Sequence, residues 1–216
     1  MRGGGEYGRD WYEAGKLENK HKVFEDLFAI AENLIARGEA TPETLAMNGL
    51  SNGGLLAGAA IAHRPDLWRV VVPQVPLFDL MEGWPLTPDY AMIRAVAYED
   101  YGNTEKPEEA RMVFAWSPYQ NLKDDTAYPA VFQIFGETDA GCLPFHGRKF
   151  TAALQHANTS DRPILYHLWK GVGHQPLDPE ISASYYAEWL CFVMDQLGMP
   201  NVKLGEFRAA NAGGNG

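Results

Sequence analysis

The stretch MNGLSNGGLL, residues 47–56, sets a serine among glycines, with apolar residues on both sides. The residues leading into it, about 44–48, predict a short β-strand, and the apolar run at 53–63 predicts a buried helix. A chain that turns sharply from a strand into a helix holds the residue at its tip in a strained conformation. The stretch is therefore either an ordinary turn or a turn that presents the Ser51 hydroxyl to a substrate.

Strand and helix patterns alternate along the rest of the chain. Further strands are predicted at 69–73, 130–135 and 164–169, and further helices at 21–37, 146–156 and 181–197. This alternation predicts the α/β class, with a mostly parallel sheet flanked by helices. Residues 1–20 are expected to be loop, residues 79–128 short helices and loops over one end of the sheet, and residues 201–216 a tail that ends in disorder.

The composition fits one domain with a sizeable core. The 216 residues are 46% hydrophobic and carry a formal net charge of −10, without a long Lys/Arg cluster, so no nucleic-acid partner is expected. No apolar run is long enough for a bilayer, and the N-terminus lacks a signal-peptide core, so we expect a cytoplasmic protein. Cys142 and Cys191 fit buried side chains in a reducing compartment, although a single bridge stays open. Neither a zinc pattern nor a phosphate loop is present, so no metal or cofactor is expected.

The glycines around Ser51 have a chemical interpretation. Gly49, Ser51 and Gly53 form the pattern Gly-x-Ser-x-Gly, which is the nucleophile elbow of α/β-hydrolases. Larger residues at both glycines are expected to clash with the adjacent strand and helix. The helix that begins at Gly53 would direct its N–H groups toward the reacting centre. A serine hydroxyl also needs a base, and the base needs an orienting carboxylate.

In this fold the catalytic residues follow the chain order Ser, Asp or Glu, His. Asp139 comes after the third predicted strand and His174 after the fourth, at the strand ends where open α/β sheets bind ligands. Glu137 is the alternative acid, because it lies closer to its strand. His167 alternates inside the fourth strand and is predicted to be structural. Three roles in the required order predict a triad of Ser51, Asp139 and His174.

The chain resembles the catalytic domain of the prolyl oligopeptidase family of serine peptidases. The similar segments are RGGGEYG (2–8), NGLSNGGLL (48–56), RPDLW (64–68), QVPLFDL (74–80), EDYGN (99–103), SPYQNL (117–122), YPAVFQIFGETDAGCLPFHGRKF (128–150) and KGVGH (170–174). The resemblance implies an α/β-hydrolase domain over residues 1–200. It also implies Ser51 as nucleophile, Asp139 as orienting acid, His174 as general base and the backbone N–H of Asn52 as one oxyanion donor.

Departures from the family pattern bear on the substrate. Gly141 stands where family members have an Arg that holds the substrate carbonyl, and Ala97 where they have a Trp that stacks on proline. The resemblance also implies that the β-propeller and the first hydrolase strands, with a tyrosine that is the second oxyanion donor, are missing. The candidate substrate contacts are Tyr98, which could partly replace the Trp, Leu77 and Cys142. Ordinary burial is the alternative for Cys142.

The sequence therefore predicts a serine hydrolase that cleaves esters or short peptides through an acyl-enzyme on Ser51, with broad ester specificity. One alternative is a prolyl oligopeptidase-like peptidase, and another is a catalytically impaired fragment or interaction module. The missing strands would leave the strand before Ser51 at an open sheet edge, which invites pairing with a second chain. The expected partners are a small ester or short peptide and a second copy of the chain, with no membrane.

Overall fold

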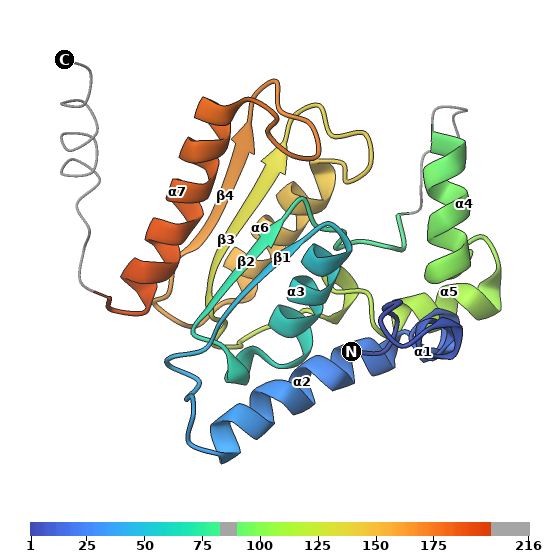
Figure 1. Cartoon of the computed structure of the whole chain (residues 1–216), viewed down its shortest axis with the longest axis horizontal. Helices are drawn as coiled ribbons and strands as arrows, with labels where there is room; N and C mark the ends of the chain where they lie inside the picture. Colours follow the sequence, from blue (N-terminus) through green and yellow to red (C-terminus); the bar gives the residue numbers. More distant parts are fainter. Residues whose placement is uncertain (83–89, 200–216) are drawn as a thin grey trace.

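Four parallel strands form the centre of the molecule, in the spatial order β1-β2-β3-β4 (Figure 1). They are β1 (Ala46–Leu50), β2 (Val70–Gln74), β3 (Ala130–Gly136) and β4 (Ile164–Trp169). The computed structural model describes residues 1–82 and 90–199. Because the strands are parallel, their carboxyl ends meet at one edge of the sheet. The predicted α/β class is confirmed.

The two central strands are buried along their whole length. Every residue of β2 (VVVPQ) and of β3 (AVFQIFG) is buried, since helices cover both faces of the sheet there. This is why these strands are almost continuously apolar instead of alternating. The outer strands β1 and β4 have partly exposed residues. No segment within residues 1–82 and 90–199 pairs with the outer edge of β1, as the sequence predicts.

Helices cover the two faces of the sheet as separate layers (Figure 1). The helices α3 (Asn52–His63) and α6 (Phe145–Ala157) cover one face, with α2 (His21–Ala36) packed against α3. The helix α7 (Pro179–Gln196) covers the other face. The bounds of these four helices agree with the predicted helices to within two residues at every end, and helix ends are the least certain part of any such prediction.

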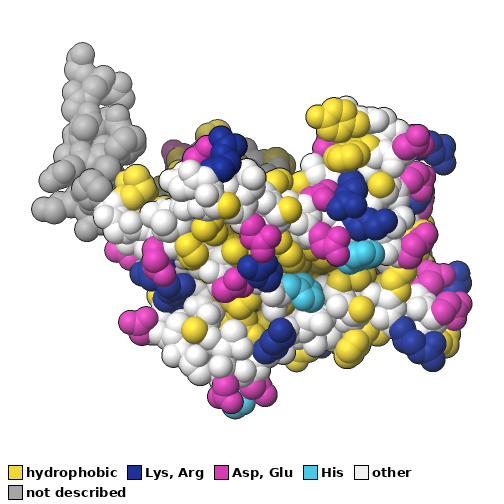
Figure 2. All heavy atoms as spheres, turned by 90° about the horizontal axis from the view of Figure 1, so that it is seen from below, with side chains coloured by type: hydrophobic (Ala, Val, Ile, Leu, Met, Phe, Trp, Pro, Cys, Tyr) yellow, Lys and Arg dark blue, Asp and Glu magenta, His cyan; other side chains and the backbone are white. Residues whose placement is uncertain are grey.

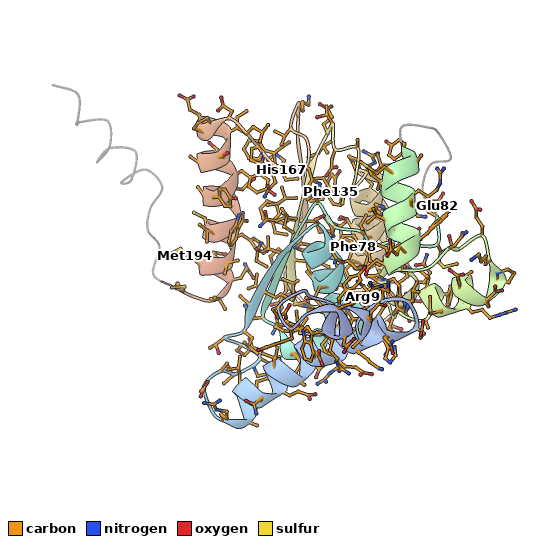
Figure 3. The ribbon with its side chains drawn as sticks, turned by 45° about the vertical axis from the view of Figure 1, so that its right-hand side comes forward. Arg9, Phe78, Glu82, Phe135, His167 and Met194 are labelled. Carbon is orange, nitrogen blue, oxygen red and sulfur yellow. The ribbon has the colours of Figure 1, made fainter. Side chains whose placement is uncertain are left out.

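The two layers enclose separate apolar clusters, because successive residues of a strand point to opposite faces. Val71, Val131 and Phe135 contact the α3 and α6 side, together with Phe78, which stacks on Phe150 at 4.0 Å between ring centroids (Figure 3). The α7 cluster contains Val70, Val72, Ala130, Phe132, Ile134 and Tyr185. His167 lies on the α7 side, where its Nδ1 is 2.8 Å from Glu188 of that helix. The predicted structural role of His167 fits this position.

The first twenty residues were expected to be loop, and this expectation is wrong in part. They contain α1 (Arg9–Glu13) and the 3-10 helix η1 (Leu17–Asn19). The segment is held because Arg2 binds Asp26 of α2 through its backbone N–H at 2.7 Å and through its guanidinium. Tertiary anchoring therefore stabilises helical turns that are too short to form alone.

The region after β2 is built of short elements, as predicted. It contains α4 (Ala91–Asp100), α5 (Pro107–Phe114) and the 3-10 helix η4 (Tyr119–Asn121), and another 3-10 helix, η2 (Pro65–Leu67), precedes β2. Figure 1 shows α4 and α5 beside α1, on the side of the molecule opposite α7. Residues 83–89 of this region and the predicted tail at 201–216 lie outside the described residues.

The surface mixes charges of both signs. Figure 2 shows acidic and basic side chains interspersed on one face, with hydrophobic side chains between them. Ion pairs such as Arg162 with Glu43, 2.8 Å, and Arg64 with Glu32 contribute to this pattern. Within the described ranges, no helix is both long and apolar enough to cross a membrane.

Candidate active site

Ser51 occupies a strained turn between β1 and α3. Its backbone angles are φ 59° and ψ −116°, in a region that side-chain-bearing residues rarely adopt. Its N–H donates to the carbonyl of Gln74, at the end of β2, at 2.9 Å, and its carbonyl accepts from Leu55 at 3.0 Å. These bonds hold a conformation that costs on the order of 1–3 kcal/mol. In this conformation the turn places the Ser51 side chain at the carboxyl end of the sheet.

The glycines of the motif do not all have the role expected of them. A Cβ on Gly49 would overlap the carbonyl of Gly53, as predicted, but a Cβ on Gly53 itself meets nothing within 4 Å. The expected clash at Gly53 is therefore wrong. Gly54 is the position where α3 approaches the sheet closely, since a Cβ there would lie 2.7 Å from Pro76 Cα and 2.9 Å from the carbonyl of Gln74.

Asp139 and His174 meet at the ends of β3 and β4. His174 Nδ1 lies 2.8 Å from Asp139 Oδ2, and the Asp139 side chain is only 1% exposed. The other carboxylate oxygen, Oδ1, accepts backbone N–H groups from Gly141 at 2.8 Å and Cys142 at 2.9 Å. Glu137, the alternative acid, is exposed and accepts from the backbone of Gly171 instead. The geometry therefore favours Asp139 as the partner of the imidazole.

The Asp139–His174 pair changes the protonation of both groups. Burial disfavours the charged carboxylate, but the hydrogen bonds from His174, Cys142 and Gly141 outweigh it and hold the pKa of Asp139 below its usual value. The hydrogen bond to Asp139 is the largest influence on His174 and raises the pKa of the imidazole, against a smaller opposing effect of burial. The pair is thus an ionised carboxylate beside an imidazole that accepts a proton readily.

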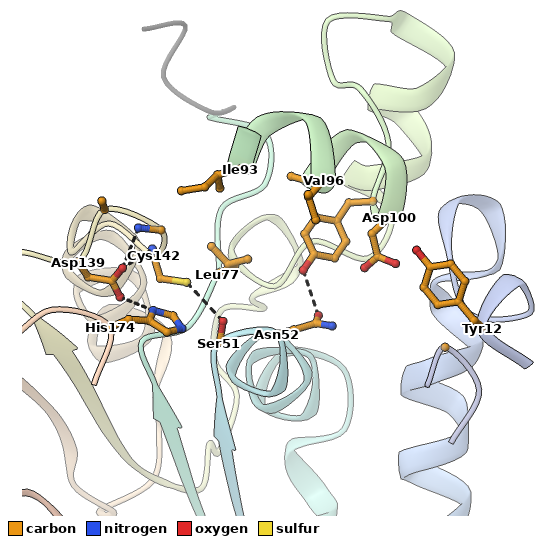
Figure 4. Close-up of a pocket in the computed structure, with 15 residues that line it drawn as sticks. Tyr12, Ser51, Asn52, Leu77, Ile93, Val96, Asp100, Asp139, Cys142 and His174 are labelled. Carbon is orange, nitrogen blue, oxygen red and sulfur yellow. Dashed lines mark hydrogen bonds and ion pairs between the residues drawn. The ribbon is translucent and has the colours of Figure 1, made fainter. Parts of the chain in front are cut away.

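Ser51 and His174 face the same space (Figure 4). Among the described residues no hydrogen bond joins the Ser51 hydroxyl to the imidazole, and the recorded neighbour of Ser51 Oγ is Cys142 Sγ at 3.9 Å. Such contacts are commonly loose in a protein without substrate and tighten when substrate binds. The His174 side chain is 43% exposed and lies in a loop, so it has room to adjust.

A cavity of about 670 Å³ connects these groups. Its wall is apolar where Ile93, Val96 and Ala97 of α4 face Leu77 and Cys142. Tyr12, Asp100 and Tyr101 also line it, and Figure 4 shows Tyr12 and Asp100 on the side away from Asp139. Burial raises the pKa of the Cys142 thiol to about 12, so the thiol is protonated at neutral pH.

Two of the three predicted substrate contacts line this cavity, and one does not. Leu77 and Cys142 line it, but Tyr98 is not among its lining residues, and the hydroxyl of Tyr98 donates to Glu105 at 3.3 Å. Tyr98 lies outside the cavity because of its rotational position on the helix. The lining residues of this segment are 93, 96, 97, 100 and 101, which share one face of α4 and its end, whereas residue 98 points off that face. The position assigned to Tyr98 is therefore corrected, and Tyr101 supplies the aromatic wall.

The contacts of Tyr101 with Asn52 and Lys20 were not predicted from the sequence. The Tyr101 hydroxyl donates to Asn52 Oδ1 at 3.1 Å, next to the backbone N–H predicted as oxyanion donor. Lys20 Nζ lies 2.7 Å from Asp100 Oδ2 and 4.7 Å above the Tyr101 ring. These contacts tie α2 and α4 to the start of α3. The helical spacing of residues 93, 97 and 101 was the available signal.

The glycine-rich segment does not supply a further donor through Gly3. Gly3 lines the cavity, but its N–H donates to the carbonyl of Trp11 at 2.9 Å. His146 also lies apart from the reacting groups, because its Nδ1 accepts the backbone N–H of Asp79 at 3.1 Å in the core. The described residues thus bring together the three predicted triad members and Asn52, and no other histidine lines the cavity.

The parallel sheet, the strained serine turn and the strand-end acid and histidine define the α/β-hydrolase class. The model of the prolyl oligopeptidase family matches residues 1–200, and the chain belongs to that family. It is 35% identical over 205 residues to a prolyl endopeptidase of Elizabethkingia miricola, covering 94% of this chain and 28% of the relative. It is 37% identical over 177 residues to a prolyl endopeptidase of Dictyostelium discoideum, covering 81% of this chain and 23% of the relative.

A solved structure agrees with this assignment. Prolyl oligopeptidase B from Galerina marginata, bound to a 35mer hydrolysis and macrocyclization substrate, superposes with a TM-score of 0.82 at 30% identity. The superposition covers 93% of this chain and 28% of that chain. The present chain therefore spans less than a third of the length of the relatives that it matches.

Two neighbouring glycines of α3 should respond oppositely to the same substitution. Gly53→Ala should be neutral or stabilising by up to about 1 kcal/mol, because the site is open and alanine favours a helix. Gly54→Ala should destabilise by roughly 1–3 kcal/mol, because its Cβ overlaps the backbone at Pro76. Urea unfolding of both variants tests this, and equal midpoints would contradict the close approach at Gly54.

The pH dependence of hydrolysis should report the Asp139–His174 contact. A general base accepts a proton only when it is neutral, and Asp139 raises the pKa of His174, the predicted base, so activity should fall as the pH drops through this raised pKa. In Asp139→Asn this acidic limb should move to lower pH, and the maximal rate should fall by about 10⁴-fold. Profiles of kcat/KM against pH measure both effects.

The matched control is Glu137→Gln, which removes the exposed neighbouring carboxylate. Its acidic limb should coincide with that of the unsubstituted protein. A shifted limb in Glu137→Gln together with an unshifted one in Asp139→Asn would reverse the assignment.

Proposed function

We propose that this chain is a serine hydrolase in which Ser51 is the nucleophile, His174 the general base and Asp139 the orienting carboxylate. The observation that carries the proposal is the 2.8 Å contact between His174 Nδ1 and Asp139 Oδ2 on the cavity that a strained Ser51 also lines. Hydroxyl, imidazole and carboxylate are the three groups that acyl transfer through serine requires.

The reaction proceeds through an acyl-enzyme. His174 takes the Ser51 proton while Oγ attacks the substrate carbonyl carbon, and the oxyanion that forms accepts the backbone N–H of Asn52 at the start of α3. The tetrahedral intermediate expels the alcohol or amine, which leaves with the proton from His174. A water then attacks the acyl group by the same route, releasing a carboxylic acid and restoring Ser51. Asp139 stays ionised throughout and stabilises the protonated imidazole.

We propose esters and short peptides with an apolar acyl side as substrates. Ile93, Val96 and Ala97 provide an apolar wall beside Ser51, and Gly141 offers no guanidinium to hold a peptide carbonyl. Esters are the better substrates in this proposal, because their cleavage needs less transition-state stabilisation than that of amides. Broad ester specificity follows in this proposal, since Ala97 offers no indole to stack on a ring and Gly141 no side chain to orient a carbonyl.

Proline-directed peptide cleavage is the second candidate. It is favoured by the family assignment and by relatives named prolyl endopeptidases, with Tyr101 available as an aromatic wall. Comparing a Gly-Pro anilide with acetate and butyrate esters of p-nitrophenol separates the candidates. A higher kcat/KM for the anilide would favour the peptidase.

Replacing the nucleophile should abolish hydrolysis. Ser51→Ala should release p-nitrophenol from short acyl esters at least about 10⁴-fold more slowly, because no acyl-enzyme can form. A fluorophosphonate should label the unsubstituted protein at Ser51 and leave Ser51→Ala unlabelled. The control is Ser184→Ala, an exposed serine on α7, which should retain both properties. Undiminished turnover in Ser51→Ala would refute the nucleophile, and an unlabelled parent protein would indicate a catalytically impaired module.

We also propose that the 216-residue chain associates with a second copy through β1. Ala46 and Asn48 are exposed along this outer strand, whose free backbone groups can pair with another strand. Sedimentation should give a species larger than the 24.0 kDa monomer. Ala46→Lys should shift the association equilibrium toward monomer through charge repulsion at the strand edge. Ala152→Lys, at an exposed position of α6, should not shift it. A compact monomer for the parent chain would refute the association.

A further inference from the structure

Three ligand-bearing side chains converge at the mouth of the cavity. Cys142 Sγ, a ring nitrogen of His174 and a carboxylate oxygen of Asp139 all lie within 4.8 Å of one another. The chain brings them together from two places, since Asp139 and Cys142 share the loop after β3 and His174 follows β4. Figure 4 shows the Cys142 sulfur directed toward Ser51, above the edge of the His174 ring. The reaction proposed above makes no use of this thiol.

The spacing is close to what a thiophilic metal requires. A tetrahedral Zn²⁺ with one sulfur and one imidazole ligand separates these atoms by about 3.5 Å. The atoms of the present cluster lie within 4.8 Å of one another, so a contraction of up to roughly 1.3 Å reaches that separation. His174 is 43% exposed in its loop, which gives it the freedom to move by this amount.

The surroundings also match those of metal-binding histidines. Such a histidine usually donates its other ring N–H to a carboxylate, which fixes the ring. Asp139 Oδ2 already holds His174 Nδ1 at 2.8 Å, so the opposite nitrogen is directed toward Ser51 and the cavity. The Cys142 side chain is a free thiol that lines the same cavity, and the cavity has room for water ligands.

We propose that a divalent cation of the Zn²⁺ class binds between Cys142 Sγ and the His174 imidazole, beside Asp139, and reversibly blocks the site. The thiol S–H bond breaks, its proton leaves to solvent and a metal–sulfur bond forms, without oxidation or reduction. The inhibition rests on the proposed function, because the cation occupies the nitrogen that would accept the Ser51 proton. Binding of the cation does not rest on it.

The ligand set predicts which cations bind. Sulfur and imidazole ligands suit Zn²⁺ and Co²⁺, whereas Mg²⁺ and Ca²⁺ prefer sets made of oxygen. MgCl₂, at concentrations at which ZnCl₂ binds, should therefore leave the site empty. The spacing of Asp139, Cys142 and His174 in the sequence corresponds to no zinc motif, which is why no metal was expected from the sequence.

Calorimetry on the Ser51→Ala protein separates binding from hydrolysis. Titration with ZnCl₂ should show one cation per chain, and adding Cys142→Ser should weaken binding by at least about tenfold. Adding Cys191→Ser instead should leave it unchanged, because Cys191 lies on α7 away from the cavity. Equal affinity with and without Cys142, or loss of affinity through Cys191→Ser, would overturn the proposal.

Two further measurements keep the proposal testable if the Cys142→Ser variant fails to fold. CoCl₂ added to the Ser51→Ala protein should produce the absorption band of a cobalt–thiolate bond, and its absence would also overturn the proposal. With the unsubstituted chain, ZnCl₂ should inhibit ester hydrolysis and a chelator should restore it, whereas Cys142→Ser should resist ZnCl₂ relative to its own metal-free rate. Zinc binding in a chain that hydrolyses nothing would support the metal site and refute the proposed function.

Discussion

The buried carboxylate of Asp139 is the contact on which the arrangement of the site depends. One oxygen holds His174 and the other accepts two backbone N–H groups, so both sides of the carboxylate are occupied. A buried carboxylate without such partners would be protonated or displaced. The three bonds keep it ionised and join the loop after β3 to the loop after β4. Without them, neither the direction of the imidazole nor the position of Cys142 would be determined.

The sheet also holds Ser51 in its strained turn, on the same side of the cavity as the Asp139–His174 pair. The Ser51 N–H is bound by the carbonyl of Gln74, so the pairing of β1 with β2 continues into the turn. Gly54 lets α3 approach the same carbonyl closely. The groups at the site therefore come from the ends of β1, β3 and β4, and β2 between them supplies the bond that holds Ser51. The packing of the sheet and the position of the site thus have the same origin, because parallel strands end at one edge of the sheet.

The sequence predicted most of this arrangement because it depends on patterns that are local in the chain. Continuous apolar runs identified β2 and β3, and chain order identified Asp139 and His174. Tyr98 was misplaced because the choice between neighbouring residues of a helix depends on rotational phase, which packing determines. The expectation at Gly53 failed for a related reason, since a clash depends on which atoms lie opposite. The cluster of Cys142 with His174 joins positions more than thirty residues apart and has no local signature.

The chemistry of the cavity wall limits the selectivity that the site can reach. An apolar pocket distinguishes acyl groups by about 1–3 kcal/mol for each methylene, whereas a pocket that hydrogen-bonds its substrate rejects mismatches far more strongly. The apolar part of the wall consists of Ile93, Val96, Ala97 and Leu77, and Gly141 adds no side-chain donor. Binding there draws on buried apolar area, which has no preferred direction. Selectivity for one ring or one carbonyl geometry would need a planar donor or an aromatic plate. The tyrosine rings on the described wall are Tyr12 and Tyr101, and the Tyr101 hydroxyl is already bonded to Asn52 Oδ1.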